Sequence, residues 1–567
     1  MDQSLQARFY ATLEAAPEAR ALTFVDPNGG FVWQTREQVY RRAAGCGKKL
    51  ADLGYNAGEI CLLVLPSNEF SATMLLATLL RGGIPLLIAP PVLQEGSNSN
   101  LLAILKGILT RTNAKLVIAH ESLEKHRVEL EKVSAKTIFV FGEKELGAFA
   151  PASVAPILPR LEDTAALQLT SGTTGFPRIC RWQQKNVLAA LDGMALAMRL
   201  SSEDICLNWT PLYHDMGLVN NFFLCLTQGV PLAMLSPIEF VKSPARWLTG
   251  LHNTGATITW SPNFGYALAA QRVKAAELAE VRLDHVKQFW NAAERIHLET
   301  VLAFHERFAP LGVRRESLKM NFGCAENVGG ATFTALDQAF VYERVDAQKL
   351  QEERIAQPVA DSETNKPTLA IVGAGQPHPH LRIRIAAEDG TFLPDGHVGE
   401  VLLDSPSRLV EYLGDAEETQ WAIREGLVRT GDLGYLRHGE LFWTGRVRER
   451  ITIRGRKIDP SEFEGILLRI PDLRPGCFAA FGVAESKLGT ERLVVISEVQ
   501  EPPAKSFDEI AAEIHERISQ GLGVPLSDIM LVRKGVLTKT SSGKRRHRYF
   551  RELYLENKIE SLYKSRT

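Results

Sequence analysis

Apolar positions in the first hundred residues alternate between helical and strand-like patterns. Residues 34–54 carry apolar side chains at helical spacing and end at Gly54, which predicts a helix. The β-rich run EICLLVLPSN (59–68) follows, then a second helical pattern over about 70–81 and the apolar run IPLLIAP (84–90). This strand–helix–strand order favours a parallel sheet covered by helices.

Short apolar runs continue this pattern and then give way to alternating strands. The runs expected to form further buried strands are KLVIAHES (115–122), TIFVFG (137–142), ALQL (166–169), PLAMLSP (231–237) and ATITWSP (256–262). From about residue 381, alternating strands with Asp-Gly turns indicate a β-rich unit. After Arg448 we expect a mixed unit, with helices at 460–469 and 507–521 and strands at 477–483 and 492–498.

Two polar stretches interrupt these patterns. Residues 92–100 (VLQEGSNSN) predict a polar loop. Residues 343–367 are highly charged and hold few residues of the buried type, so composition alone predicts a solvated insertion that adds nothing to a core.

Composition narrows the class of protein. A chain of 567 residues is too long for one core, and 45% hydrophobic with 23% charged residues is ordinary for a soluble enzyme. The net charge of −1 argues against nucleic acid as a partner. Seven scattered Cys without a C-x-x-C pair argue against a disulfide framework or zinc site and favour a reducing compartment. We expect a cytoplasmic protein, because there is no signal-peptide core and no apolar run nears the roughly 20 residues of a transmembrane segment.

The stretch LTSGTTGFPRICRW (169–182) carries the first candidate chemistry. Its backbone N–H groups and the hydroxyls of Ser171, Thr173 and Thr174 could surround phosphate oxygens while Arg178 supplies charge. It is not a Walker loop, because G-x-x-x-x-G-K-[ST] is absent. The alternative for this stretch alone is a polar surface turn between two strands.

Six further motifs follow in order: WTPLYHDMGL (209–218), NAAER (291–295), FGCAEN (322–327), RTGDLG (429–434), GRVRERITIRGRK (445–457) and LTKTSSGKRR (537–546). Their order resembles the adenylate-forming superfamily of acyl-CoA synthetases, adenylation domains and luciferases. SPNFGYAL (261–268) and IVGAGQPHPHLRIRI (371–385) are similar to the fatty acyl-AMP ligase branch. In that branch the stretch 343–367 falls where an extra segment restrains the C-terminal domain and disfavours CoA.

The resemblance implies a fold and a function. The fold is α/β: an N-terminal domain (1–447) of two stacked α/β subdomains plus a β-rich subdomain (about 370–447), then a small mobile α+β domain (448–567). The function is ATP-dependent conversion of a fatty or related carboxylic acid to acyl-AMP, followed by transfer to the phosphopantetheine of an acyl carrier protein. Two alternatives stay open: an acyl-CoA synthetase, and a degenerate, non-catalytic nucleotide-binding scaffold.

The resemblance also implies roles for single residues, with ATP and Mg²⁺ as cofactors. The expected phosphate-binding residues are Thr170, Ser171, Gly172, Thr173, Thr174, Gly175 and Arg178, and the expected adenine- and ribose-binding residues are Ala293, Glu294, Phe322, Gly323, Asp432 and Arg446. Glu326 matches the Mg²⁺-associated carboxylate, Arg448 the hinge, and Lys544 the catalytic cation between two anions. His214 is expected to gate or line the acyl site, with a structural histidine as the alternative.

Several positions depart from the family pattern. Arg178 replaces a usual Lys and Ile179 a usual Gly, while Ala292 and Arg295 stand where Gly and Pro are typical. An Arg fork can still bind phosphate. The added methyl of Ala292 is expected to narrow the space beside the nucleotide.

Overall fold

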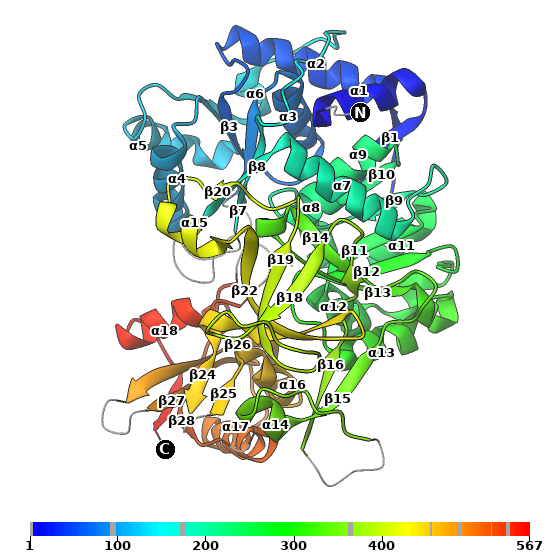
Figure 1. The fold of residues 1–567 in the computed structure, drawn as a ribbon. Helices are drawn as coiled ribbons and strands as arrows, with labels where there is room; N and C mark the ends of the chain where they lie inside the picture. The colour runs from blue at the N-terminus through cyan, green and yellow to red at the C-terminus, as the bar shows by residue number, and fades with distance from the viewer. Residues whose placement is uncertain are drawn as a thin grey trace.

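The computed structural model describes residues 4–90, 98–170, 177–360, 367–453, 456–485, 490–522, 524–539 and 545–566. These residues form several sheets with helices on their faces, which confirms the predicted α/β class (Figure 1). In the described residues, no helix combines the length and apolar character that crossing a membrane requires.

The first half of the chain builds a mostly parallel sheet of seven strands. Its strands, in spatial order, are β20 (Glu411–Tyr412), β8 (Ile179–Gln183), β7 (Thr164–Leu169), β4 (Ile84–Leu87), β3 (Ile60–Val64), β5 (Leu116–Ala119) and β6 (Ile138–Phe141). The strands from β7 to β6 are parallel, as predicted, while β7–β8 and β8–β20 are antiparallel pairs. Helices α2 (Arg36–Asp52) and α3 (Glu69–Leu80) match the predicted helices, and each begins with a capping box.

A second sheet of nine strands follows along the chain. Its spatial order is β17 (Gln376–Pro377), β14 (Gly329–Phe333), β13 (Leu318–Cys324), β12 (Gln288–Ala292), β11 (Ile258–Pro262), β9 (Cys206–Asn208), β10 (Leu232–Leu235), β1 (Arg20–Val25) and β2 (Gln34–Thr35). The central strands are parallel, so their carboxyl ends lie at one edge. Helices α11 (Ala245–Thr254), α12 (Asn263–Arg272) and α13 (Leu298–Phe308) contribute to the cluster that includes Trp247, Tyr266 and Phe304.

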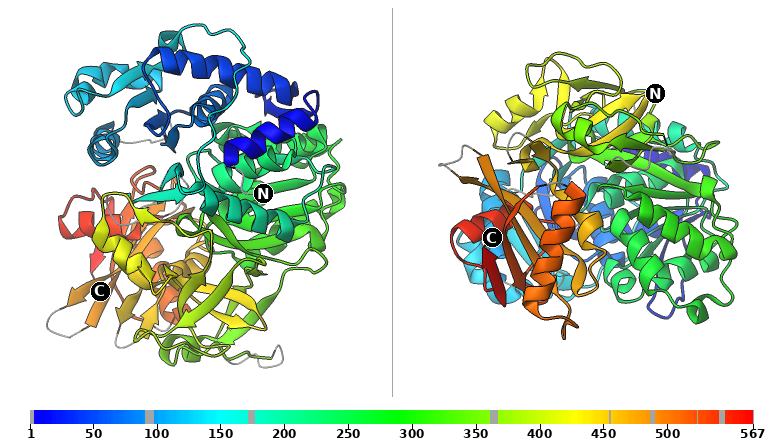
Figure 2. Two further views of the ribbon diagram at one scale, coloured as in Figure 1. Left: turned by 45° about the horizontal axis from the view of Figure 1, so that its top comes forward. Right: turned by 90° about the horizontal axis from the view of Figure 1, so that it is seen from below.

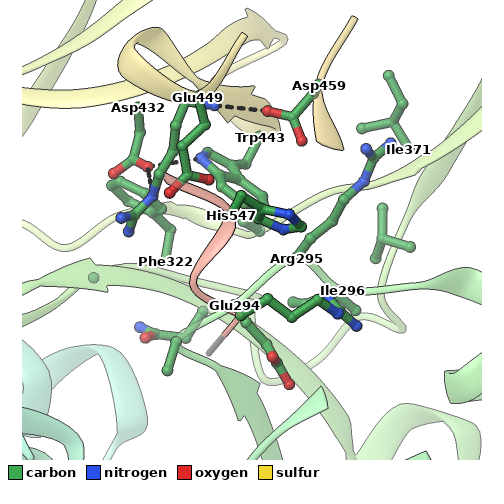
Figure 3. Close-up of a pocket in the computed structure, with 17 residues that line it drawn as sticks. Glu294, Arg295, Ile296, Phe322, Ile371, Asp432, Trp443, Glu449, Asp459 and His547 are labelled. Atoms are coloured by element: carbon green, nitrogen blue, oxygen red, sulfur yellow. Dashed lines mark hydrogen bonds and ion pairs between the residues drawn. The ribbon is translucent and has the colours of Figure 1, made fainter. Parts of the chain in front are cut away.

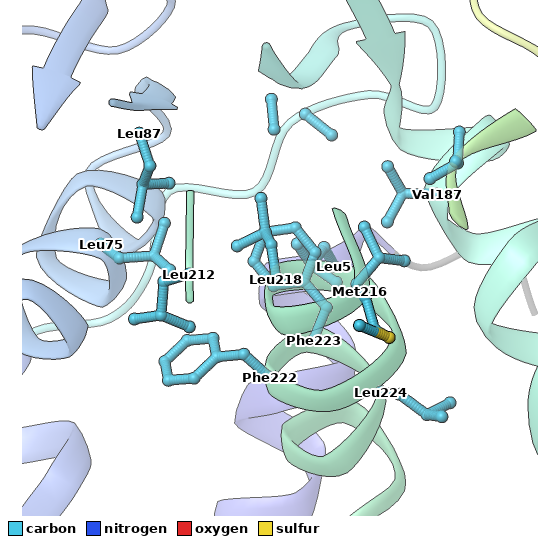
Figure 4. Packing of buried hydrophobic residues seen from close by; sticks show 14 of the residues in the cluster. Leu5, Leu75, Leu87, Val187, Leu212, Met216, Leu218, Phe222, Phe223 and Leu224 are labelled. Carbon is cyan, nitrogen blue, oxygen red and sulfur yellow. The ribbon is translucent and has the colours of Figure 1, made fainter. Parts of the chain in front are cut away.

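One large hydrophobic cluster joins the two sheets. It includes Leu63 of the first sheet and Trp290 of the second, together with side chains of α7 (Gln184–Met198). Figure 4 shows Leu75, Leu212 and Phe222, which come from separate elements, packed close to one another. Burial of this apolar surface fixes the two sheets relative to each other.

The C-terminal half forms smaller sheets (Figure 2). A β-rich part contains β18 (Arg382–Ala386), β19 (Gly399–Asp404), β21 (Ile423–Arg424), β22 (Leu427–Arg437) and β23 (Glu440–Arg446). Beyond it, β24 (Ile451–Ile453) pairs with β25 (Arg456–Ile458), and a four-stranded sheet joins β26 (Leu473–Glu485), β27 (Thr490–Val499), β28 (Leu526–Val532) and β29 (Tyr563–Arg566). Helices α17 (Phe507–Leu522) and α18 (His547–Leu555) belong to two different clusters with this sheet.

The stretch 343–367 differs from the expectation drawn from its composition. Strand β15 (Tyr342–Asp346) pairs antiparallel with β16 (Thr368–Val372), and α14 (Ala347–Glu352) begins directly after β15. Val345 is 0% exposed and belongs to a cluster with Leu350, Ala356 and Tyr435. The prediction that this stretch adds nothing to a core is therefore wrong, because its few apolar residues are the ones that pack.

Two other predicted boundaries change. Residues 98–100 of the expected polar loop form the start of helix α4 (Asn98–Thr112), whereas 91–97 lie outside the described residues. The helix expected at 460–469 is shorter, with a 3₁₀ turn at Pro460–Phe463 followed by α16 (Glu464–Leu467). The loop and helix-end positions were therefore the least well predicted.

Candidate active site

A cleft opens at the carboxyl-end edge of the nine-stranded sheet. The lining residues are Ala293, Glu294, Arg295, Ile296, Asn321, Phe322, Gly323, Ile371, Val372, Ala374, Asp432, Trp443, Arg446, Glu449, Asp459, Arg545 and His547. Its space, open mouth included, is about 1030 Å³, which is ample for a small-molecule site. All six residues expected to bind adenine and ribose line this one cleft (Figure 3).

Asp432 is held by two neighbours on strand β23. It is 4% exposed, and its Oδ1 accepts a hydrogen bond from Trp443 Nε1 at 3.1 Å. Arg446 Nε lies 3.2 Å from the same oxygen, because Asp432 and Arg446 are paired in the β22–β23 register. Burial disfavours the Arg446 cation, but the charges of Asp432 and Glu449 outweigh this effect and raise the pKa of Arg446. The cleft therefore contains an ion pair whose carboxylate is buried and whose guanidinium is partly exposed.

The opposite wall follows the ends of β12 and β13. Ala293, directly after β12, has a φ of +72°, a left-handed conformation that an L-residue rarely adopts. The next residue, Glu294, accepts a hydrogen bond from the backbone N–H of Phe264 at 2.6 Å. A residue strained at such an edge is a common feature of functional sites.

The same wall of the cleft includes Phe322 and Gly323, which lie near the end of β13. Phe322 is 9% exposed, and its backbone N–H donates to Thr332 Oγ1 at 3.1 Å. A Cβ on Gly323 would approach the Gly329 carbonyl oxygen to 2.5 Å, so only glycine fits this position without a backbone shift. The chain therefore holds the Phe322 ring where it lines the cleft.

The expected phosphate-binding loop connects β7 to β8. Thr170 N–H donates to the Arg178 carbonyl at 2.9 Å, and Arg178 N–H donates to Thr170 Oγ1 at 3.3 Å. Ser171, Gly172, Thr173, Thr174 and Gly175 lie outside the described residues. The two ends of the loop are thus joined by one backbone hydrogen bond and one bond to the Thr170 hydroxyl.

Arg178 and Glu326 are connected through Tyr412 of β20. The Arg178 guanidinium lies 4.6 Å from the centre of the Tyr412 ring, and the Tyr412 hydroxyl donates to Glu326 Oε1 at 2.6 Å. Burial and the Glu326 charge both raise the pKa of Tyr412, so the phenol stays protonated and can donate. Arg178 also forms an ion pair with Glu418, at 2.7 Å.

Three other predicted residues lie outside the cleft lining or outside the described residues. His214 Nδ1 accepts from Met216 N–H at 3.2 Å and lies 2.7 Å from Asp215 Oδ1, as a cap of the short helix α8 (Asp215–Gly217). Arg448 is exposed and pairs with Glu418 at 3.1 Å. Lys544 lies outside the described residues.

Sequence reasoning missed several lining residues. Arg545 and His547 enter the cleft from the C-terminal segment, drawn in red in Figure 3, and His547 Nδ1 accepts from Ala480 N–H at 3.0 Å. The run KRRHR (544–548) is basic, yet its His547 is buried. Their place beside Lys544 was the signal that could have found them. Trp443, Glu449 and Asp459 carried no such signal.

Within the described residues, no group of three or more His, Cys, Asp or Glu side chains is arranged to hold a metal ion. Any metal here would depend on single carboxylates and on a ligand. Glu326 fits that situation: Oε1 accepts from Tyr412, while Oε2 accepts no hydrogen bond from a described residue. Mg²⁺ is bound in this way, through one or two carboxylates plus phosphate oxygens and water.

Comparisons with known proteins identify the family of this chain. The family model for AMP-binding enzymes matches residues 9–413. A medium-chain-fatty-acid–[acyl-carrier-protein] ligase of Moorena producens is 30% identical over 88% of this chain and 86% of its own length. A putative fatty-acid–CoA ligase of Mycobacterium tuberculosis is 27% identical over 96% of both chains.

The fold comparison points the same way. A structure from a study of fatty acyl-adenylate ligases of E. coli and L. pneumophila superimposes with a TM-score of 0.88, at 26% identity and 98% coverage of both chains. The resemblance noted from the ordered motifs is thereby confirmed at the level of family and fold. The chain belongs to the family of AMP-binding enzymes, within the adenylate-forming superfamily.

Proposed function

We propose that this protein uses ATP to activate a fatty or related carboxylic acid as acyl-AMP and then transfers the acyl group to the phosphopantetheine thiol of an acyl carrier protein. The observation that supports the proposal most is the cleft that collects six expected nucleotide-binding residues. Arg545 reaches the same cleft and is the direct neighbour of Lys544.

The proposed first step joins two anions. A carboxylate oxygen of the acid bonds to the α-phosphorus of ATP while the bond to pyrophosphate breaks. Lys544 would lie between the acid and the α-phosphate, where its ammonium offsets their repulsion. Thr170, Arg178 and the loop residues 171–175 would hold the phosphates, and Mg²⁺ on Glu326 would neutralise phosphate charge.

The nucleoside would occupy the cleft between Phe322 and Asp432. The Phe322 ring offers a face on which adenine can stack, with Ala293 and Glu294 at its edge. Asp432 has two carboxylate oxygens for the two ribose hydroxyls, and Arg446 Nε lies 3.2 Å from one of them. His214 stays a candidate for the acyl site, although its cap bond equally fits a structural role.

In the proposed second step the carrier's thiol sulfur bonds to the acyl carbon, the thiol proton is lost, and AMP leaves. One contact favours a carrier over CoA. Gln351 of α14 donates to Glu462 Oε2 at 2.8 Å, and Arg456 of β25 donates to Gln351 Oε1. The stretch 343–367 thus contacts the C-terminal unit (448–567), which supports the proposal that it restrains this unit and disfavours CoA.

The two alternative functions predict different assay results. An acyl-CoA synthetase would share the first step but use CoA as acceptor, and a relative with that description is 27% identical. A degenerate scaffold would bind nucleotide without acid-dependent ATP–pyrophosphate exchange. Intact Glu326 and Asp432 argue against the scaffold, because each keeps the carboxylate that the chemistry requires.

One experiment tests all three functions. The protein is incubated with ATP, Mg²⁺ and a panel of saturated fatty and aryl acids, and ATP–pyrophosphate exchange is measured. CoA and a carrier bearing phosphopantetheine are then offered separately, with the same carrier lacking that arm as control. Acyl transfer to the armed carrier alone supports the proposal. Transfer to CoA supports the synthetase, and no exchange with any acid supports the scaffold.

A further inference from the structure

Glu418 contacts two arginines that the sequence places far apart. It lies in the first turn of α15 (Ala416–Ala422), beside β20 (Figure 1). Its Oε2 lies 2.7 Å from Arg178 Nη1, and its Oε1 lies 3.1 Å from Arg448 Nη1. A second Arg448 nitrogen, Nη2, donates to both oxygens at 3.1 and 3.2 Å. One carboxylate therefore joins the end of the expected phosphate loop to the expected hinge.

The surroundings hold both arginines in place. Arg178 lies over the Tyr412 ring, and Arg448 lies 4.4 Å from the centre of the Trp421 ring. Tyr412 N–H donates to Thr419 Oγ1 at 2.9 Å, which fixes β20 against α15. Glu418 and both rings thus come from the single segment 411–422, so a movement of either arginine acts on the same short piece of chain.

Two arginines share their nearest carboxylate. Within the part of the chain that the structure describes, Glu418 is the one carboxylate within 4 Å of either guanidinium, although the Glu326 charge also acts on Arg178. Because both guanidinium groups pair with the same carboxylate, each arginine weakens the hold of Glu418 on the other. An added anion beside Arg178 would compete with Glu418 for that arginine.

We propose that Glu418 is a positioning residue. Arg178 and the hinge residue Arg448 compete for its carboxylate, and the nucleotide phosphates compete with that carboxylate for Arg178. The proposal rests on the proposed function in one respect, the assignment of Arg178 to the phosphates. Without nucleotide, Glu418 is shared. When phosphate oxygens take Arg178, the carboxylate is left to Arg448, so nucleotide binding tightens the grip on the hinge.

The first test measures ATP binding without any acid substrate, by calorimetry with Mg²⁺. Glu418→Gln removes the competing charge, and we expect ATP to bind about three- to tenfold more tightly, as for a partly exposed charge. Glu417→Gln is the matched control, because it removes the same charge from the adjacent, exposed residue of α15. Its ATP affinity is expected to stay within twofold of that of the natural protein. A structural defect would weaken binding, so tighter binding cannot arise from damage.

The second test asks whether the hinge residue acts through Glu418. Arg448→Gln leaves Glu418 to Arg178 alone, so ATP should bind more weakly. In the Glu418→Gln background this loss should shrink at least threefold, as a double-mutant cycle measures. Equal losses in both backgrounds, or equal effects of Glu417→Gln and Glu418→Gln, would overturn the proposal.

The two levels of failure are distinguishable. If the natural protein binds no ATP, the proposed function fails and Glu418 has nothing to compete with. If ATP binds but Glu418→Gln binds it no more tightly, the proposed function stands and the role of Glu418 is wrong. Thermal unfolding of each variant checks that the fold is kept.

Discussion

Carboxylates in the cleft region are held by aromatic donors. Asp432 accepts from Trp443, and Glu326 accepts from Tyr412, which leaves each with further oxygen lone pairs for a ligand. A ring N–H or O–H fixes the carboxylate without cancelling its charge. Residue chemistry of this kind supports nucleotide binding at Asp432 and phosphate-linked metal binding at Glu326.

Asp432→Asn should weaken ATP binding without unfolding the protein. Asn keeps an oxygen that can accept from Trp443 but loses the charge, and each charge-assisted hydrogen bond to ribose is worth about 1.5–3 kcal/mol. Asp432→Ala should cost more and also lower the melting temperature, because Trp443 and Arg446 would both lose the oxygen that they contact. Calorimetric titration with ATP measures the affinity. An unchanged affinity in the Asn variant would mean that Thr-Gly-Asp is only a turn here.

Lys544→Ala should slow acyl-AMP formation by about 10²–10³-fold, since one preorganised cation beside the reacting phosphate would be lost. Lys539→Ala is the matched control, because Lys539 is an exposed lysine five residues earlier in the same segment. ATP–pyrophosphate exchange with a saturating acid measures the rate, and thermal unfolding checks the fold. Equal rates for the two variants would remove Lys544 from the catalytic step.

At the scale of elements, the stretch 343–367 supplies most of strand β15 and, through α14, a contact with the C-terminal unit. β15 and β16 pair over five residues, and Val345 is fully buried while its neighbour Val341 is 45% exposed. Val345→Ala should lower the free energy of unfolding by about 1.5–3 kcal/mol through lost burial and a cavity. Val341→Ala deletes the same atoms at an exposed position and should cost less than about 0.5 kcal/mol. Equal effects in denaturant titrations would return the stretch to a solvated insertion.

The elements also show where sequence reasoning succeeded and where it stopped. The strands at 60–64, 116–119 and 258–262 were predictable because each is a short apolar run bounded by polar or turn residues. The packing of 343–367 was not, because three apolar side chains among many charges do not reveal that a neighbouring strand covers them. In the cleft, motif residues were predictable, but Trp443 and His547 depend on tertiary contacts that no local pattern records.

At the scale of the whole molecule, two further parts of the chain contribute side chains to the cleft. Asp432 and Trp443 come from the β-rich part, while Arg545 and His547 come from the segment that leads into α18. The contact of α14 with β25 and Glu462 lies next to this cleft, because Arg295 and Asp459 line both the cleft and a smaller cavity beside Gln351. The contact of α14 with the C-terminal unit therefore lies beside the cleft.

Gln351→Ala should make CoA a better acceptor. Gln351 is 3% exposed and bridges Glu462 and Arg456, so its truncation removes these two hydrogen bonds and leaves the 3.9 Å contact of Glu352 with Arg456. A C-terminal unit that is less restrained can rotate further and admit the thiol of free CoA. Acyl-AMP formation, which uses the cleft itself, should change little. We expect the ratio of CoA thioester to carrier thioester to rise several-fold at matched adenylation rates.

Gln348→Ala gives the matched control for this prediction. Gln348 lies one turn earlier on α14, is exposed, and donates only to Glu352 of its own helix at 3.1 Å. The same type of side chain is thus removed without deleting a direct bond to the C-terminal unit, because Glu352 keeps its own contact with Arg456 at 3.9 Å. The acceptor ratio should therefore stay at the natural value. If both variants give the natural ratio, or shift it equally, the α14 contact does not govern acceptor choice. Selectivity would then have to arise where the carrier or CoA meets the surface, and not from the restraint of the C-terminal unit.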